Sequence, residues 1–136
     1  MATIIQEIMI DASPDDVWAA VRDFGNVHTR LVPGFVTDCR LEGDVRTVTF
    51  FNGLVAKEPL IGIDEGARRL AYTATGGRAS HYNASVQVFA EGKDRTRFVW
   101  TIDLLPNELA PAIGGMAEKG AAIIKQTLES AAKKSR

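Results

Sequence analysis

The most regular hydrophobic pattern in the chain lies near its C-terminal end, in residues 106–133. Apolar residues recur there at intervals of three and four, and most charged residues fall between them. This spacing predicts a long helix with one buried face. The buried face is slim because it includes Ala117 and Gly120, and a glycine inside a helix costs about 1 kcal/mol relative to alanine. We therefore expect this helix to pack closely against a sheet or to border a cavity.

Short runs rich in β-branched and aromatic residues fill most of the remaining chain. The first run, residues 3–11, is rich in isoleucine and predicts a strand. Turn signals such as NG and EGKD separate six further runs, which predict an antiparallel meander. Within the last two runs, alternation places Tyr82 and Trp100 on the face turned toward the long helix. The six predicted strands are 35–41, 46–51, 55–63, 69–74, 80–90 and 95–104.

Two short helices are predicted between the first two strands. In DASPDDVWAAVRDF, Ser13 can cap a helix, Pro14 suits its first turn, and the two aspartates that follow favour its positive end. Gly25 ends this helix, and NVHTRLV predicts a second short one. The whole order predicts an α+β fold, in which a curved antiparallel sheet of about seven strands carries the long C-terminal helix across its concave face.

The composition and charge of the chain limit the classes of function that we expect for it. A chain of 136 residues fits a single domain, residues 1–136, that buries roughly two thirds of its unfolded surface. The 16 basic and 17 acidic residues form no basic stripe, so we do not expect a nucleic-acid partner. The N-terminus has no basic region before its apolar residues, and no run could span a bilayer. Together with Cys39 as the only cysteine, this favours a soluble, cytoplasmic protein.

The element order resembles a known superfamily. With ASPDDVWAAVRDFGNV near the start and WTIDLLPNELAPAIGGMAEKGAAIIKQTLE at the end, the chain resembles the START-like, birch-pollen-allergen-like superfamily, also called SRPBCC. Within it, the chain is similar to the polyketide cyclase/dehydrase-like branch and, more distantly, to the abscisic acid receptors of plants. The resemblance implies a helix-grip fold with a cavity between the sheet and the long helix, which holds a hydrophobic or amphipathic small molecule.

Two stretches allow residues to be carried over from the receptor-like relatives. NGLVAKEPLIGIDEGARRLAY is similar to their gate loop and pocket glutamate, which implies a gate at residues 52–54 and a pocket position for Glu58. TGGRASHYNASV is similar to their second loop and pocket tyrosine, which falls on Tyr82. However, the gate here is shorter and lacks its proline, and Thr37 replaces the lysine that holds the hormone's carboxylate. Abscisic acid is therefore not the expected ligand.

The sequence leaves two interpretations of Glu58 open. Apolar residues occupy both faces of its strand, and Pro59 could mark a bulge that decides the register. If Glu58 points inward, desolvation raises its pKa and it becomes a possible proton donor or acceptor, with Tyr72, Tyr82 or a ligand group as its partner. If it points outward, it is a solvated strand residue.

Aromatic residues provide the other candidates. The hydroxyls of Tyr72 and Tyr82 either contact a ligand or are satisfied locally in the core. We favour a pocket role for Tyr82 and a core role for Tyr72, and keep both as candidates. Trp100, Phe51 and Phe35 could form an aromatic wall, of which only Trp100 is kept.

The sequence offers no motif for a metal or cofactor. His28 and His81 lack a second histidine or carboxylate at ligand spacing, so we expect no metal site. The chain also has no phosphate loop, dinucleotide fingerprint or nucleophile elbow. We therefore expect no cofactor.

Two functions follow from these observations. The first is binding of a hydrophobic or aromatic small molecule between the sheet and the C-terminal helix. The alternative is a polyketide cyclase/dehydratase-type enzyme in which the same cavity positions a substrate and Glu58 and Tyr82 transfer a proton. A protein-interaction role has no specific residue behind it, and the oligomeric state stays open. The candidate ligand-binding residues are Leu54, Glu58, Tyr72, Tyr82, Trp100, Ile113, Met116, Ala117 and Gly120.

Overall fold

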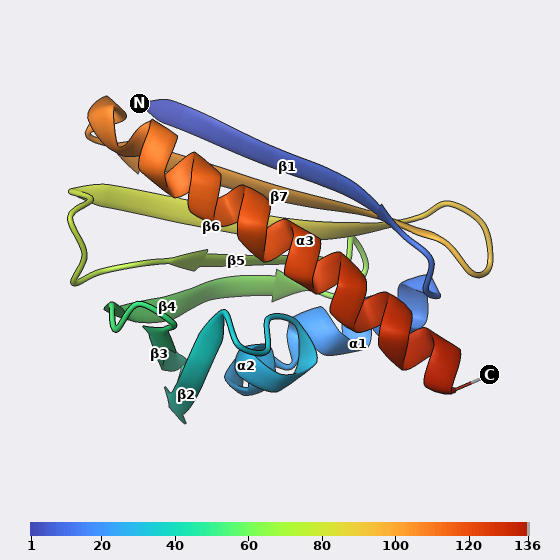
Figure 1. The fold of residues 1–136 in the computed structure, drawn as a ribbon. Coiled ribbons are helices and arrows are strands. Elements are labelled where there is room, and N and C mark those ends of the chain that lie inside the picture. Colours follow the sequence, from blue (N-terminus) through green and yellow to red (C-terminus); the bar gives the residue numbers. More distant parts are fainter. Residues whose placement is uncertain (136) are drawn as a thin grey trace.

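A seven-stranded antiparallel sheet forms the framework of the protein. The computed structural model describes residues 1–135, and the strands follow the order β1-β7-β6-β5-β4-β3-β2. Because β1 pairs with β7, the first and last strands of the chain are neighbours (Figure 1). The strands are β1 (Ala2–Ile10), β2 (Val36–Glu42), β3 (Val45–Phe50), β4 (Val55–Asp64), β5 (Arg69–Thr73), β6 (His81–Ala90) and β7 (Thr96–Leu105).

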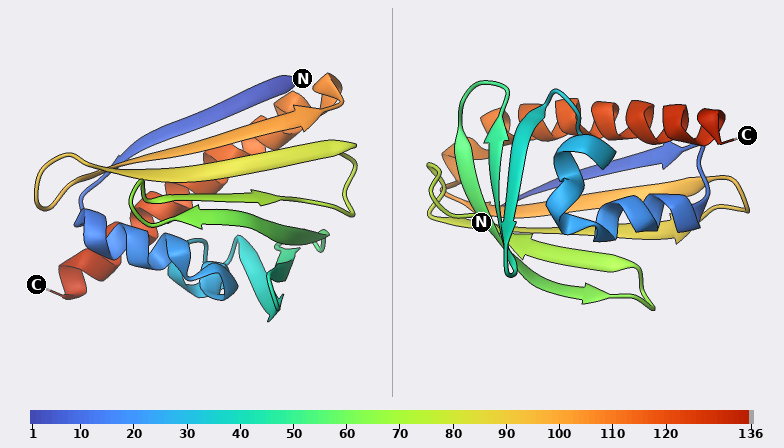
Figure 2. Two further views of the ribbon diagram at one scale, coloured as in Figure 1. Left: turned by 180° about the vertical axis from the view of Figure 1, so that it is seen from behind. Right: turned by 90° about the horizontal axis from the view of Figure 1, so that it is seen from below.

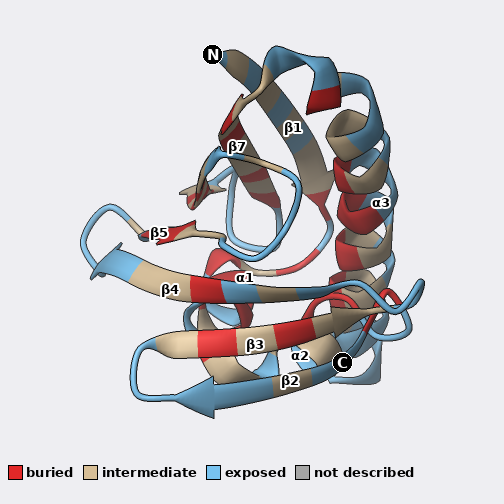
Figure 3. Ribbon diagram, turned by 90° about the vertical axis from the view of Figure 1, so that its left-hand side faces the viewer, coloured by how far each residue is buried: buried red, intermediate tan, exposed pale blue. Residues whose placement is uncertain are grey.

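The helices confirm the predicted helix-grip fold. α3 (Ala110–Lys134) runs diagonally across one face of the sheet (Figure 1), and the sheet curves around it (Figure 3). It begins later than predicted, because residues Asn107–Leu109 form a 3-10 helix, η2. Between β1 and β2 lie α1 (Pro14–Arg22), the 3-10 helix η1 (Phe24–Asn26) and α2 (Val27–Arg30).

The N-terminal end of α1 is built as its sequence predicts. The Ser13 hydroxyl accepts a 3.2 Å hydrogen bond from the Asp16 backbone N–H, and Pro14 occupies the first turn. Both features satisfy or avoid backbone N–H groups that have no partner within the helix. α1 then packs against β6 and α2 against β2, which brings the two short helices beside one end of the sheet (Figure 2).

β4 connects the two parts of the curved sheet. Its first half pairs with β3, and its second half pairs with β5. We had expected a bulge at Pro59. The register instead shifts between Leu60 and Gly62, so the irregularity lies after Pro59. Pro59 itself stays opposite Val45. Regular pairing through this half of β4 sets Glu58 directly opposite Arg46.

The core lies between the concave face of the sheet and α3. Phe98, Ile102 and Leu104 of β7 are almost completely buried, and a stripe of buried positions follows α3 (Figure 3). This stripe includes Gly120, where an added Cβ atom would lie 3.4 Å from both the Phe35 and the Trp100 rings. Glycine therefore permits the helix to approach these two rings closely.

Candidate functional site

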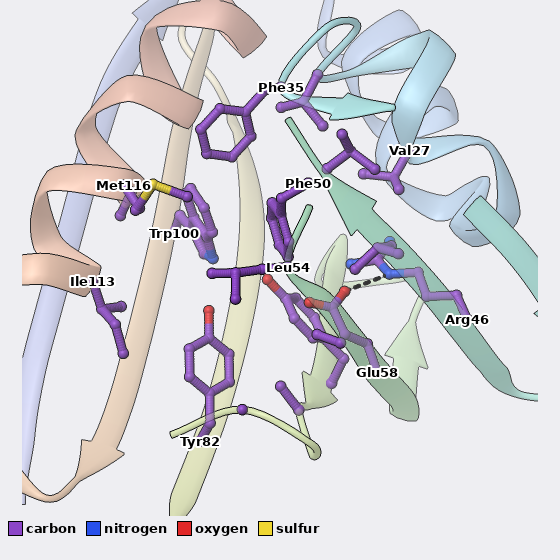
Figure 4. A pocket seen from close by; sticks show the side chains of 18 of the residues that line it. Val27, Phe35, Arg46, Phe50, Leu54, Glu58, Tyr82, Trp100, Ile113 and Met116 are labelled. Carbon is purple, nitrogen blue, oxygen red and sulfur yellow. Dashed lines mark hydrogen bonds and ion pairs between the residues drawn. The ribbon is translucent and has the colours of Figure 1, made fainter. Parts of the chain in front are cut away.

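A cavity of about 540 Å³ lies between α3 and the sheet (Figure 4). Strands β3–β7, the segment around α2 and the first half of α3 all contribute to its lining, and most of the lining residues are apolar. The volume falls within the range of about 300–1,000 Å³ that is typical of small-molecule sites.

Eight of the nine candidate residues line this cavity. Gly120 does not, because the Phe35 and Trp100 rings cover it. Gly120 therefore does not line the cavity as we predicted, and its small size serves close packing, the other role that the sequence left open. The eight lining candidates are Leu54, Glu58, Tyr72, Tyr82, Trp100, Ile113, Met116 and Ala117.

Glu58 points inward and forms a buried ion pair with Arg46. The Arg46 Nε donates to the Glu58 carboxylate at 2.7 Å, and the two residues are 6% and 7% exposed. Burying a carboxylate away from water is costly unless an opposite charge and hydrogen bonds compensate it. Arg46 supplies both, whereas we had expected a tyrosine or a ligand group as the partner.

The Arg46 side chain is itself held on several sides. Its guanidinium lies 3.9 Å from the Phe24 ring centroid and 4.8 Å from that of Tyr72. One terminal nitrogen also donates to the Phe24 carbonyl at 3.2 Å. These cation–π and hydrogen-bonding contacts fix the guanidinium in the cavity wall. Sequence reasoning missed Arg46, although it shares the inward face of β3 with Val48 and Phe50.

The tyrosine pair contributes hydroxyl groups rather than charges. The Tyr72 and Tyr82 rings lie 6.5 Å apart between centroids. Burial, followed by the negative charge of Glu58, raises the pKa of Tyr72. Burial, followed by the proximity of Tyr72 and then of Glu58, raises the pKa of Tyr82. Both side chains are therefore neutral hydrogen-bonding groups at neutral pH and cannot act as phenolate bases there.

Trp100 presents a polar atom without a partner. Its Nε1 is buried and makes no hydrogen bond with any residue from 1 to 135. In Figure 4 the nitrogen-bearing end of the Trp100 ring and the Tyr82 hydroxyl are directed toward the same part of the cavity, whereas Glu58 and Arg46 lie on the opposite wall. The Trp100 N–H and the Tyr82 hydroxyl also lie close enough to Tyr72 to favour its phenolate and so oppose the rise in its pKa.

The aromatic wall differs in part from the one expected. Phe35 and Phe50 line the cavity with Trp100, and the Phe35 and Phe50 rings meet edge to face with centroids 5.8 Å apart. Phe51, which we had placed in the wall, lies outside the lining and is 47% exposed. Its ring instead lies beside the Lys119 ammonium, 4.6 Å from the ring centroid.

Two loops border the cavity at its rim. The turn after β3 brings Leu54, 61% exposed, to the lining, and a 2.8 Å bond from the Phe50 N–H to the Leu54 carbonyl closes this turn. The loop after β5 contributes residues 74–79. Paired backbone bonds of 2.8 and 3.1 Å tie Thr75 to Lys57. The rim is therefore anchored at both of its loops.

Two further properties concern the part of the chain that the structure describes. Within residues 1–135, no group of three His, Cys, Asp or Glu side chains is arranged to hold a metal ion. None of the helices in that range is long and apolar enough to cross a membrane.

Comparison with known families assigns the chain. Residues 1–136 match the model of the family described as "Polyketide cyclase / dehydrase and lipid transport". The chain belongs to this family. Membership in this family supports a ligand-binding or cyclase role. A comparison with curated proteins finds no match.

Solved structures share the fold at low sequence identity. A START superfamily protein from Mycobacterium smegmatis is 14% identical with a TM-score of 0.76, and 98% of this chain and 99% of that chain are covered. The Zhui aromatase/cyclase from Streptomyces sp. R1128 is 16% identical with a TM-score of 0.76, covering 98% and 94%. Norcoclaurine synthase from Thalictrum flavum is 23% identical with a TM-score of 0.67, covering 95% and 95%. At these identities the likeness concerns the fold alone.

Proposed function

We propose that the protein binds a hydrophobic or aromatic small molecule in the cavity between the sheet and α3. The observation that carries this proposal is the cavity of about 540 Å³, whose mostly apolar lining holds a few polar groups. Apolar walls favour transfer of an apolar ligand out of water, and a few fixed polar atoms orient it.

The construction of the walls supports the same function. The ligand would lie between Trp100 on the sheet and Ile113 and Met116 on α3 (Figure 4). These side chains are only partly buried by the protein itself, so a ligand gains contact area with them. Aromatic rings offer stacking surfaces, and a methionine adapts its shape to the molecule that it contacts.

Fluorescence titration with N-phenylnaphthylamine tests this proposal. The probe is apolar and emits strongly when it leaves water, so the wild-type protein should enhance its emission in a saturable manner. Ala117 lines the cavity and is 2% exposed, and Ala117→Phe should weaken probe binding by filling space. Ala122 is exposed on α3 and lies outside the lining, so Ala122→Phe is the matched control and should bind as the wild type does.

Two results would count against binding in the cavity. One is the absence of saturable emission together with native mass spectra of fresh protein that contain no retained molecule. The other is equal loss of probe binding in Ala117→Phe and Ala122→Phe, which would assign the effect to the protein surface or to general destabilisation.

A second candidate function is proton transfer on a ligand held in the same cavity. The specific observation is the Glu58 carboxylate, which lies in the lining and is paired with Arg46. Glu58 would take a proton from a carbon next to a ketone, and the electron pair of that C–H bond would form the C=C bond of an enolate. The C=O electron pair would move to oxygen as the enolate forms. After the protonated Glu58 has exchanged with heavy water, it would deliver a deuteron to the carbon, and the C=O bond would form again. Tyr82 would donate a hydrogen bond to the enolate oxygen.

Hydrogen–deuterium exchange of beta-tetralone in heavy water tests this second function. The wild type should accelerate exchange at the acidic carbon, and Glu58→Gln should reduce the acceleration by about 10²–10⁴-fold. Tyr82→Phe should reduce it less. Glu42 is an exposed glutamate on β2, so Glu42→Gln is the matched control. If Glu58→Gln exchanges at the wild-type rate, Glu58 is not the base.

A further inference from the structure

We propose that Trp100 Nε1, together with the Tyr72 and Tyr82 hydroxyls, forms a subsite for the carbonyl oxygen of an uncharged aromatic ketone. This inference rests on the proposed binding function and specifies the chemical class of the ligand. The groups come from β7, β5 and β6, and all three side chains line the cavity.

The two tryptophans of the chain show why Trp100 is distinctive. Trp18 Nε1 donates to the Glu65 carboxylate at 2.7 Å, so its hydrogen-bonding capacity is used within the protein. Trp100 Nε1 is buried, and it has no partner among residues 1–135. An indole N–H can only donate, and a buried donor without a partner is unfavourable. The missing partner must therefore be an acceptor, which an oxygen atom of a ligand supplies.

The tyrosines add donors of the same kind. The Tyr72 hydroxyl lies within hydrogen-bonding reach of the Tyr82 hydroxyl and of the Trp100 N–H, so the three groups form one cluster. Burial and the nearby Glu58 charge keep both hydroxyls protonated. Each can therefore rotate its O–H toward an oxygen in the cavity. These neutral groups on one wall define a place for one acceptor atom.

The charges of the lining favour an uncharged oxygen over a carboxylate. Arg46 is already paired with Glu58 at 2.7 Å, so this pair offers no free positive charge. Arg78, the other charged residue of the lining, is exposed at the rim. A carboxylate at the Trp100 subsite would lose its hydration and face Glu58 without a counter-charge, which is unfavourable. A ketone oxygen meets neither penalty.

Fluorenone and fluorene test the subsite because they share one ring skeleton and differ in a single carbonyl oxygen. Wild-type protein should bind fluorenone about fivefold to tenfold more tightly than fluorene, as one added hydrogen bond in a dry site allows. Trp100→Phe removes the N–H and part of the stacking surface, so it should weaken the binding of both compounds but reduce the fluorenone preference to about twofold or less. Trp18→Phe removes the other indole and should keep the wild-type preference.

Two-dimensional NMR of the indole N–H groups provides a readout that requires no change at the subsite. The wild type has two tryptophans, and Trp18→Phe leaves only the Trp100 signal. Fluorenone should move that signal downfield, as a new hydrogen bond does, and fluorene should not. Tyr82→Phe should reduce the fluorenone preference by about twofold to fivefold, so it tests the subsite even if Trp100→Phe does not fold.

The outcomes separate this inference from the function on which it rests. Equal affinity for the two compounds, with no selective shift of the Trp100 signal, would overturn the acceptor subsite and leave small-molecule binding intact. Failure of both compounds to bind would contradict the binding function and the subsite together.

Discussion

The two walls of the cavity treat their polar groups in opposite ways. On the wall formed by β3 and β4, Arg46 and Glu58 satisfy one another at 2.7 Å, and the Phe24 carbonyl accepts a further bond from Arg46. On the wall formed by β5, β6 and β7, Trp100 Nε1 has no partner among residues 1–135. The polar groups of the first wall are paired without a ligand, whereas the second wall has one hydrogen-bond donor without a partner.

This difference links the first wall to the stability of the fold and the second wall to ligand recognition. Removing one partner of a buried ion pair leaves the other charge buried without compensation, which strongly destabilises the folded protein. An unpartnered donor already carries its cost in the folded protein, and an acceptor atom of a bound ligand relieves it. We therefore expect substitutions on the first wall to act mainly on folding and substitutions on the second wall to act mainly on ligand preference.

The largest effect should come from breaking the ion pair. Glu58→Leu leaves the Arg46 guanidinium buried without its carboxylate, and we expect it to lower the free energy of unfolding by about 3–5 kcal/mol. Urea denaturation followed by circular dichroism measures the loss.

The double variant Arg46→Met with Glu58→Leu is the control for this prediction. It removes both charges at similar volume, so it should recover most of the lost stability. If Glu58→Leu alone is as stable as the wild type, the pair does not stabilise the first wall as described.

A smaller effect should come from overpacking behind the second wall. Gly120→Leu forces a side chain against the Phe35 and Trp100 rings, which lie 3.4 Å from the Cβ position. We expect a loss of about 1–3 kcal/mol in unfolding free energy. Because Trp100 must move, binding of N-phenylnaphthylamine should weaken as well.

Gly115 on the same helix provides the matched position. An added Cβ there meets no atom within 4 Å, so Gly115→Ala should stabilise the protein by up to about 1 kcal/mol through its better helix propensity. Thermal unfolding compares the two variants. Equal destabilisation by both would show that the contacts of Gly120 do not matter.

The smallest expected effect concerns alkaline pH and the tyrosines of the second wall. The folded-state pKa of Tyr72 and that of Tyr82 are raised, whereas tyrosines in the unfolded chain titrate near pH 10. The stability that the protonated hydroxyls contribute is therefore fully present below about pH 10 and is lost as the pH rises further. Tyr72→Phe should make the alkaline fall in stability shallower.

Ultraviolet titration of the phenolates checks this prediction directly, because the chain contains only two tyrosines. Both should ionise above the ordinary range in the native protein. Ionisation of either one near pH 10 without unfolding would contradict the description of this wall as a set of protonated donors.

Most of the fold followed from the sequence because its signals are local. The period of the hydrophobic residues identified α3, the alternation in β6 and β7 identified the inward face, and Ser13 with Pro14 identified the start of α1. Each of these features depends on neighbours within a few residues. The position of the irregularity in β4 was misplaced, because it depends on pairing with both β3 and β5.

The site was only partly predictable because its key relations are long-range. The inward direction of Glu58 could not be decided from β4 alone, and its partner Arg46 comes from β3. Alternation within β3 was available as a signal, since Arg46 shares a face with Val48 and Phe50. The close contact of Gly120 with Phe35 and Trp100 has no such signal, because small residues are equally consistent with open space and with close packing.

Intermolecular NMR contacts between bound fluorenone and methyl-labelled protein test the central claim most directly, because they locate the ligand. Binding in the cavity predicts contacts from the aromatic protons of fluorenone to the methyl groups of Ile113 and Met116, which line it. Contacts confined to the exposed Ile61 and Ile63 of β4 would contradict a binding site between the sheet and α3.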